Sequence, residues 1–259
     1  MGELVFIGLG LHDEKDLTLR AVEEGKKCDV LFAEFYTSAL RGSSPSRFNE
    51  LLGKEVRVLT RKDVEEGNII LNEAATKTVG FLVPGDPMTA TTHADLRLRA
   101  AKQGIVTRVI HGVSILTAAA GLLGLQSYKF GRTVTIPFQE EKFRPSSPYE
   151  MVALNRQAGL HTLVLLDLKE GGRFMTANEG MRYLLEQENR MSYWTFSSNP
   201  LICVLARVGS ANPHVRAGRI NDLLNQEFGD PLHCLVVPGK LHFAEKEALI
   251  VLAGAPANI

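Results

Sequence analysis

The sequence has few cysteines, no excess of either charge and no long apolar run. Its three cysteines, Cys28, Cys203 and Cys234, lie far apart, and none has a metal-type spacing. This odd number of separated thiols, two of them inside apolar segments, predicts buried reduced cysteines and a cytoplasmic protein. No stretch of about eighteen apolar residues occurs, and no apolar core follows a charged N-terminus, so we expect no membrane span and no secretory signal.

The balance of charges argues against nucleic acid as a partner. Lys plus Arg is 29 and Asp plus Glu is 29, so the formal net charge is zero. A neutral chain whose basic residues occur at most in pairs is poorly suited to grip nucleic acid through its phosphates. With 259 residues, 45% of them hydrophobic, the chain is long enough for one large or two modest α/β domains.

One stretch, residues 79–93, has the pattern of a ligand-binding turn. It reads V-G-F-L-V-P-G-D-P-M-T-A-T-T-H. The apolar start predicts a strand buried on both faces, Pro84 and Gly85 end it, and a helix is expected over residues 92–102. Asp86 would then lie at the carboxyl end of a parallel sheet, where open α/β sheets bind ligands. An ordinary turn with a capping carboxylate is the alternative interpretation.

The first half alternates strands with helices. Apolar runs predict strands at residues 4–7, 30–35, 56–59, 79–83 and 106–110. Helices are expected at residues 15–25, 47–52, 63–76 and 92–102, although Gly67 weakens the third. Short loops in this order indicate a parallel sheet with right-handed crossovers.

The N-terminal turn Gly8-x-Gly10 resembles the start of a dinucleotide-binding fingerprint. The third glycine is missing, because position 13 is Asp13, but Glu34 follows at the spacing of a ribose-binding acid. A nicotinamide-dependent oxidoreductase therefore remains open at this point. Ser114 is expected to lie close enough to the Asp86 turn to touch the same ligand. His111 has no partner that the sequence identifies, and we interpret it as structural.

The second half is less regular. Strands are expected at residues 133–136, 161–168, 201–208 and 233–237, and helices at 149–159, 176–189 and 218–226. Residues 207–219 read as a polar loop, and 245–252 as a strand or a short helix. We expect two domains, residues 1–112 and 113–259, with a ligand in the cleft between them.

Eight ordered elements resemble one enzyme family. They are I-G-L-G-L, P-G-D-P-M-T-A-T-T-H, H-G-V-S-I, H-T-L-V-L-L-D, M-T-A-N-E, A-R-V-G-S, G-D-P-L-H and V-P-G-K-L-H. In this order and at these spacings they resemble the diphthine synthase family, within the tetrapyrrole-methylase-like class of S-adenosylmethionine methyltransferases. The resemblance covers residues 4–255. The L-G-L-H-D turn, in place of the G-x-G-P-G-D pattern of porphyrin-type members, favours the diphthamide branch.

The resemblance implies two α/β domains with the methyl donor in the cleft between them, in a homodimer. It implies donor contacts from Leu11, Asp86, Thr89, Ser114, Ile115, Leu166, Val208 and His233. Thr89 and Val208 depart from the side chains expected there, so their contacts would be made by the backbone. No metal is implied.

The activity implied is repeated methylation, from S-adenosylmethionine, of the amino group of an aminocarboxypropyl-histidine on translation elongation factor 2. S-adenosylhomocysteine is the other product. A general base is not assigned, although His12, Asp13 and Glu34 lie near the first loops. A methyltransferase acting on a tetrapyrrole and a non-catalytic binding module are the alternatives.

Overall fold

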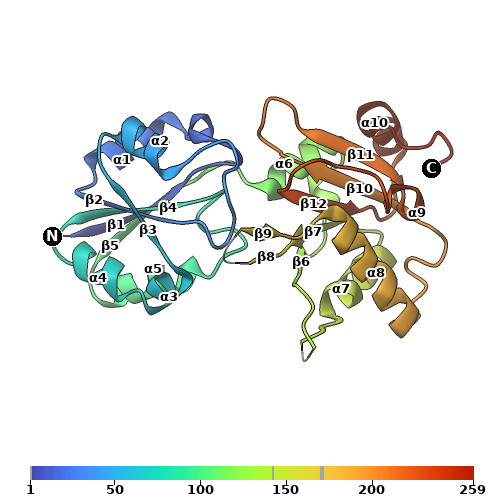
Figure 1. The fold of residues 1–259 in the computed structure, drawn as a ribbon, viewed down its shortest axis with the longest axis horizontal. Coiled ribbons are helices and arrows are strands. Elements are labelled where there is room, and N and C mark those ends of the chain that lie inside the picture. The colour runs from blue at the N-terminus through green and yellow to red at the C-terminus, as the bar shows by residue number, and fades with distance from the viewer. Residues whose placement is uncertain (1, 142, 170–171) are drawn as a thin grey trace. The chain divides into compact units, whose positions relative to one another are not determined.

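The computed structural model describes residues 2–141, 143–169 and 172–259. The chain divides into two compact units, Met1–Ile115 and Leu116–Ile259, whose elements are labelled in Figure 1. The domain boundary after residue 112 stays a prediction. Within the described ranges, no helix has both the length and the apolar character needed to cross a membrane.

The first unit is built on a five-stranded sheet of order β3-β2-β4-β1-β5. Every neighbouring pair in it is parallel, as the sequence predicts. The strands are β1 (Glu3–Gly8), β2 (Val30–Glu34), β3 (Val56–Leu59), β4 (Thr78–Val83) and β5 (Val106–Ile110). All five therefore end at the same edge of the sheet.

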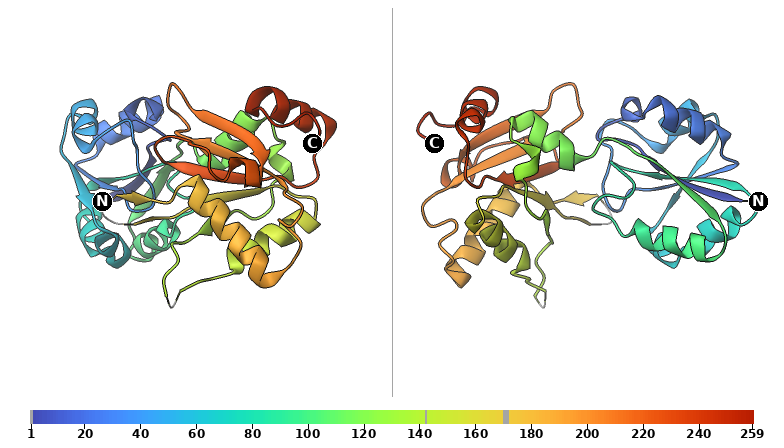
Figure 2. Two further views of the ribbon diagram at one scale, coloured as in Figure 1. Left: turned by 45° about the vertical axis from the view of Figure 1, so that its right-hand side comes forward. Right: turned by 180° about the vertical axis from the view of Figure 1, so that it is seen from behind.

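Helices cover both faces of this sheet (Figures 1 and 2). They are α1 (Leu19–Lys27) and α2 (Pro45–Leu52) on one face, and α3 (Arg61–Glu66), α4 (Asn68–Ala74) and α5 (His93–Lys102) on the other. In β1, Leu4 and Phe6 pack into one core and Val5 and Ile7 into the other. Burial of both faces explains why this strand is a continuous apolar run.

Two predicted helices of this unit have different bounds. The expected helix over residues 63–76 is two helices, because Gly67 ends α3 and begins α4 with φ of 70°. That left-handed conformation suits glycine and cannot continue an α-helix. The helix expected from residue 15 begins at Leu19, after a 3-10 turn, η1 (Glu14–Asp16). Thr18 caps it by accepting from the Ala21 N–H.

The second unit contains a mixed sheet of order β11-β10-β12-β7-β6. Only β6 and β7 are parallel, whereas the other three pairs are antiparallel. The strands are β6 (Val134–Ile136), β7 (Thr162–Leu166), β10 (Leu201–Ala206), β11 (His214–Arg219) and β12 (His233–Val237), with a separate ribbon of β8 (Leu168–Lys169) and β9 (Arg173–Phe174). Cys203 and Cys234 are buried in this sheet, and Cys28 is buried in the first unit, which confirms the predicted burial.

Helices also cover the second sheet. They are α7 (Ser147–Gln157), α8 (Ala177–Met191) and α9 (Ile220–Leu223), with α6 (Ile115–Leu123) and α10 (Phe243–Ala253), and a 3-10 turn η2 (Ser127–Lys129) follows α6. Figure 1 places α7 and α8 on one side of this sheet and α6 and α10 on the other. The capping box predicted at Thr176 and Glu179 is present at the start of α8.

The sequence interpretation was wrong around residues 207–226. The predicted polar loop contains β11, and the predicted helix at 218–226 is the single turn α9. β11 pairs only with β10 at the edge of the sheet, and its side chains are mostly half-buried. It therefore lacks the apolar run by which a central strand is identified. The ambiguous segment at 245–252 is helical, within α10.

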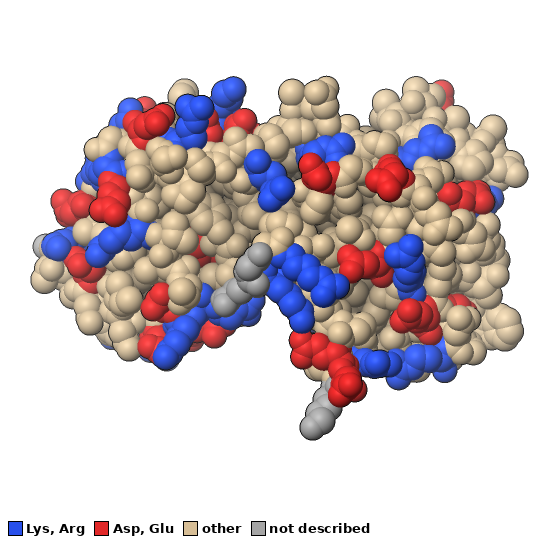
Figure 3. All heavy atoms as spheres, viewed as in Figure 1, with Lys and Arg blue, Asp and Glu red and all other residues tan. Residues whose placement is uncertain are grey.

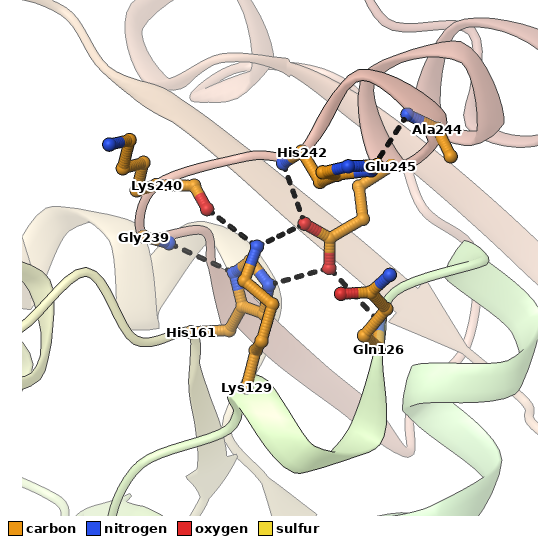
Figure 4. Close-up of polar contacts among 8 residues, drawn as sticks. All are labelled: Gln126, Lys129, His161, Gly239, Lys240, His242, Ala244 and Glu245. Atoms are coloured by element: carbon orange, nitrogen blue, oxygen red, sulfur yellow. Dashed lines mark hydrogen bonds and ion pairs between the residues drawn. The ribbon is translucent and has the colours of Figure 1, made fainter.

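A buried carboxylate ties α10 to one end of the second sheet (Figure 4). Glu245 accepts hydrogen bonds from the backbone N–H groups of Gln126 and His242, at 3.0 and 2.8 Å. It also accepts from His161 Nε2 at 3.0 Å and from the Lys129 ammonium. The imidazole Nδ1 of His161 accepts from the Gly239 N–H, so its Nε2 carries the proton. This Glu245 cluster lies at the opposite end of β7 and β12 from Leu166 and His233.

Candidate functional site

Three loops meet where β1, β4 and β5 end in the first unit. Gly10 and Gly85 exchange backbone hydrogen bonds across the gap between two of them. A Cβ added at Gly112 would lie 2.3 Å from the Gly85 carbonyl oxygen, so the third loop contacts the second through bare backbone. A Cβ at Gly85 would meet nothing within 4 Å, and its φ is 71°. The edge thus combines close backbone packing with open space beside Asp86.

Asp86 is the organising side chain of this edge. One of its oxygens, Oδ1, accepts from the Met88 N–H at 3.0 Å and from the Thr89 hydroxyl at 3.1 Å. The other, Oδ2, lies 2.7 Å from His111 Nδ1. Burial opposes ionisation, but these hydrogen bonds outweigh it and hold the pKa of Asp86 below its usual value. Asp86 is therefore an anion whose two oxygens are both held.

The other site residues predicted in this unit follow the same strand ends. Leu11 lies beyond β1, where its N–H donates to Asp16 Oδ2 at 3.0 Å. Thr89 belongs to the Asp86 turn, Ser114 lies between β5 and α6, and Ile115 is the first residue of α6. All four are half-buried. The structure thus brings all five predicted residues of this unit to one edge of its sheet.

The three predicted residues of the second unit also share one sheet edge. The antiparallel register pairs Cys234 with Leu165 and His233 with Ala206. The end of β7 at Leu166, the start of β12 at His233 and the loop after β10 at Val208 are therefore neighbours. Leu166 packs over α8, because a Cβ at Gly180 would lie 2.7 Å from its Cδ2.

His233 is a buried and fully engaged imidazole. Its Nδ1 accepts from the Ala177 N–H at 3.1 Å, and its Nε2 donates to the Gly229 carbonyl at 3.1 Å. Burial keeps its pKa below the ordinary value, so the ring is neutral. The ring therefore links the loop before β12 to the start of α8.

Glu34 does not have the environment of a ribose-binding acid. Its side chain is completely buried, and it accepts from the N–H groups of Tyr36 and Thr37, at 3.0 Å each, and from the Thr37 hydroxyl. Burial is the main reason that its pKa is raised. Its Oε1 lies 3.9 Å from Nε2 of the equally buried His93. Glu34 thus organises its own loop.

Sequence reasoning missed two features of these edges. One is the partner of His111, because Asp86 lies 25 residues earlier and only the parallel sheet brings the two loops together. The other is Arg207, whose Nη1 donates to the carbonyls of Phe228 and Asp230 at 2.8 and 3.2 Å. Its backbone has a φ of 53°, which is uncommon for arginine, and nothing in the sequence marks it.

Comparison with known proteins defines the class. The family model of Tetrapyrrole (Corrin/Porphyrin) Methylases matches residues 3–223. This match agrees with the two α/β units of the fold. The sequence expectation of a tetrapyrrole-methylase-like α/β fold is thereby confirmed.

Individual relatives narrow the class further. The chain is 49% identical over 257 residues to diphthine synthase of Methanothermobacter thermautotrophicus, covering 99% of this chain and 97% of the relative. It is 48% identical over 250 residues to diphthine synthase of Methanocaldococcus jannaschii, covering 95% and 97%. A crystal structure of diphthine synthase, 39% identical, superposes with a TM-score of 0.90 over 98% of this chain and 97% of the other.

The chain belongs to the diphthine synthases within the tetrapyrrole methylase family. It is an S-adenosylmethionine-dependent methyltransferase of the diphthamide pathway. The oxidoreductase alternative suggested by Gly8-x-Gly10 is therefore wrong, and the buried, occupied carboxylate of Glu34 gives the physical reason.

Proposed function

We propose that the chain methylates the amino group of an aminocarboxypropyl-histidine on translation elongation factor 2, repeatedly, to give diphthine. The observation that carries the proposal is nearly full-length similarity to relatives named diphthine synthase. The held turn at Asp86 supports it, because a reaction of this kind asks mainly for placement. The sulfonium is already activated, so orientation of amine, methyl carbon and sulfur in line can supply several kcal/mol, about 7 or more in favourable cases.

The donor in this proposal is contacted by the eight residues that the family resemblance implies. In the first unit, Leu11, Asp86, Thr89, Ser114 and Ile115 contact it at the edge formed by β1, β4 and β5. In the second, Leu166, Val208 and His233 do so. Open space at Gly85 suits close approach of a ligand, and half-buried groups beside it offer donors and acceptors. S-adenosylmethionine supplies the electrophilic methyl group.

The side chains of Asp86 and His233 act in this proposal by holding loops. Both carboxylate oxygens of Asp86 and both ring nitrogens of His233 are hydrogen-bonded to groups of the protein itself. Their backbone atoms are therefore the direct contacts with the donor. Removing either side chain releases a loop, which predicts weakened donor binding.

A homodimer and a cytoplasmic setting complete the proposal. Apolar side chains are exposed on α10, with Val251 72% and Leu252 56% exposed. Leu252 lies near the end of α6, because a Cβ at Gly124 would be 3.3 Å from its Cδ1. Burial of such a surface would favour self-association. On the face drawn in Figure 3, acidic and basic side chains are interspersed, which suits a protein partner better than a nucleic acid.

Calorimetric binding tests the donor site. Purified protein is titrated with S-adenosylhomocysteine, NAD and a corrin precursor, beside the variants Asp86→Ala and Asp95→Ala. We expect binding of S-adenosylhomocysteine alone, weakened at least about tenfold by Asp86→Ala, or about 1.4 kcal/mol. Asp95 serves as the control because its side chain is 67% exposed on α5.

Transfer to elongation factor 2 tests the substrate. Factor that carries the aminocarboxypropyl-histidine is incubated with labelled donor, and mass spectrometry counts the methyl groups on the residue. Binding of S-adenosylhomocysteine without transfer to this factor would contradict the proposed substrate. Methylation of a corrin precursor instead would support the alternative that the chain is a tetrapyrrole methyltransferase.

A further inference from the structure

Methylation of an amine needs a proton acceptor at each round. The amine lone pair attacks the methyl carbon, the carbon–sulfur bond breaks, and its electron pair stays on sulfur. The nitrogen then carries a positive charge and has no lone pair until one N–H proton leaves. Because the free α-amino group is also mostly protonated at pH 7, a base has to accept one proton from the nitrogen before every transfer, the first included. This requirement rests on the proposed function.

His111 and Asp86 have the geometry of an oriented base. Nδ1 of the imidazole lies 2.7 Å from Asp86 Oδ2. The His111 side chain is 76% exposed, whereas Asp86 is only 11% exposed. A mostly buried carboxylate thus holds one nitrogen of a mostly exposed ring. Nε2 is the nitrogen that Asp86 does not hold.

The Asp86 carboxylate that orients the His111 ring is itself held by other groups. Its other oxygen is held by the Met88 N–H and the Thr89 hydroxyl. The anion makes Nδ1 the donor of the pair, which leaves the lone pair of the neutral ring on Nε2. When Nε2 takes up a proton, the adjacent anion stabilises the imidazolium, as in oriented Asp–His pairs of other enzymes.

The backbone around His111 is also constrained. It follows Ile110, the last residue of β5, and precedes Gly112, which packs against Gly85 and Gly8 with no room for a side chain. A Cβ at Gly8 would lie 2.5 Å from the Gly112 nitrogen. The imidazole therefore stands on a fixed loop, next to Ser114 and Ile115 of the proposed donor site.

The other groups near the first loops are committed elsewhere. Glu34 is fully buried and occupied by its own loop. Asp13 Oδ1 accepts from the Lys15 N–H and caps η1. The His12 ring packs on Gly42, where an added Cβ would lie 2.4 Å from its Nε2. Among these candidates, only His111 is an exposed base held by a buried anion.

We propose that His111 is a catalytic residue that accepts, on Nε2, the proton leaving the acceptor amine, with Asp86 as its positioning residue. The sequence interpretation of His111 as structural is replaced by this role. The base returns its proton to solvent between rounds. The final transfer leaves a nitrogen with four carbon substituents and no proton to lose, so the cycle stops there.

The test is single-turnover methyl transfer to elongation factor 2 carrying the aminocarboxypropyl-histidine. It compares the natural protein with His111→Ala, His111→Gln and His12→Ala, with S-adenosylhomocysteine binding measured for each. We expect both His111 variants to transfer at least about a hundredfold more slowly, the usual scale for a lost general base. Their affinity for S-adenosylhomocysteine should stay within about threefold, a change of about 0.7 kcal/mol or less. Added imidazole should raise the rate of His111→Ala.

Several results would overturn the proposal. A His111→Ala rate within about threefold of the natural protein would do so, as would a loss that follows His12→Ala instead. A loss that imidazole does not raise, or that is matched by lost S-adenosylhomocysteine binding, would assign His111 a structural role. These outcomes leave the proposed function standing. Absence of transfer by the natural protein, in contrast, would refute the proposed function itself.

Discussion

Glu245→Gln should be among the most destabilising single polar changes in the second unit. The carboxylate is 1% exposed and accepts from four donors, the N–H groups of Gln126 and His242, His161 Nε2 and the Lys129 ammonium (Figure 4). A glutamine amide has one acceptor oxygen and presents an NH₂ group to the remaining donors. The variant therefore leaves buried donors without an acceptor and the half-buried ammonium of Lys129 without its counter-ion.

The expected loss of stability follows from the pKa shift of the Glu245 carboxyl group. Burial opposes its ionisation, but the four donors outweigh burial and lower the pKa of Glu245 from 4.5 to about 2. At about 1.4 kcal/mol per unit, this difference contributes roughly 3 kcal/mol to the free energy of unfolding at neutral pH. Loss of one partner from a buried ion pair costs a similar 3–5 kcal/mol or so. We expect Glu245→Gln to lose about 3 kcal/mol.

Hydrogen exchange measured in urea provides the probe, and the chain offers a matched control. The amides of residues 116–259 report on the second unit, whereas the single tryptophan, Trp194, is 78% exposed and would report unfolding weakly. Glu247→Gln makes the same chemical change on an exposed residue of α10 and should alter stability by about 0.5 kcal/mol or less.

The pH dependence provides a second check with a defined sign. Because the folded pKa of Glu245 is depressed, its contribution is present above about pH 4.5 and is lost as pH falls towards 2. The difference between the natural protein and Glu245→Gln should therefore shrink in acid. A loss below about 1 kcal/mol at pH 7, or one no larger than that of Glu247→Gln, would refute the reasoning.

Two further predictions concern the first unit. Burial lowers the pKa of His93 from 6.5 to about 4, so folding excludes a proton that the unfolded chain binds, and stability is lost as pH falls through this range. Between pH 7 and pH 5 the free energy of unfolding should fall by about 2 kcal/mol, partly offset by the raised pKa of Glu34. Hydrogen exchange of first-unit amides measures this fall, which should be smaller in His93→Gln. Gly67→Ala should lower the thermal midpoint more than Gly53→Ala. Both glycines have φ near 70°, but a Cβ at Gly67 would meet Leu96 and Arg99 within 3 Å, whereas one at Gly53 meets nothing within 4 Å. Equal midpoints would show that backbone strain alone sets the cost.

The sequence alone determined the parallel sheet of the first unit. Strands buried on both faces need apolar side chains at every position, and β1 and β4 accordingly appear as continuous apolar runs. The same physics located Asp86, because a Gly/Pro turn directly after such a strand must lie at the carboxyl edge of the sheet. The capping box of α8 was also predicted, since it involves residues only three positions apart.

The tertiary structure decided what depends on distant residues. β11 is a half-buried edge strand whose identity comes from pairing with β10, and no local pattern marks it. The pair of His111 with Asp86 exists because β4 and β5 flank β1 in the sheet, and the pair of His161 with Glu245 joins residues 84 positions apart. Local propensity and burial can be predicted from neighbouring residues in the sequence, whereas these polar contacts arise only when the strand order of a sheet brings separate loops together.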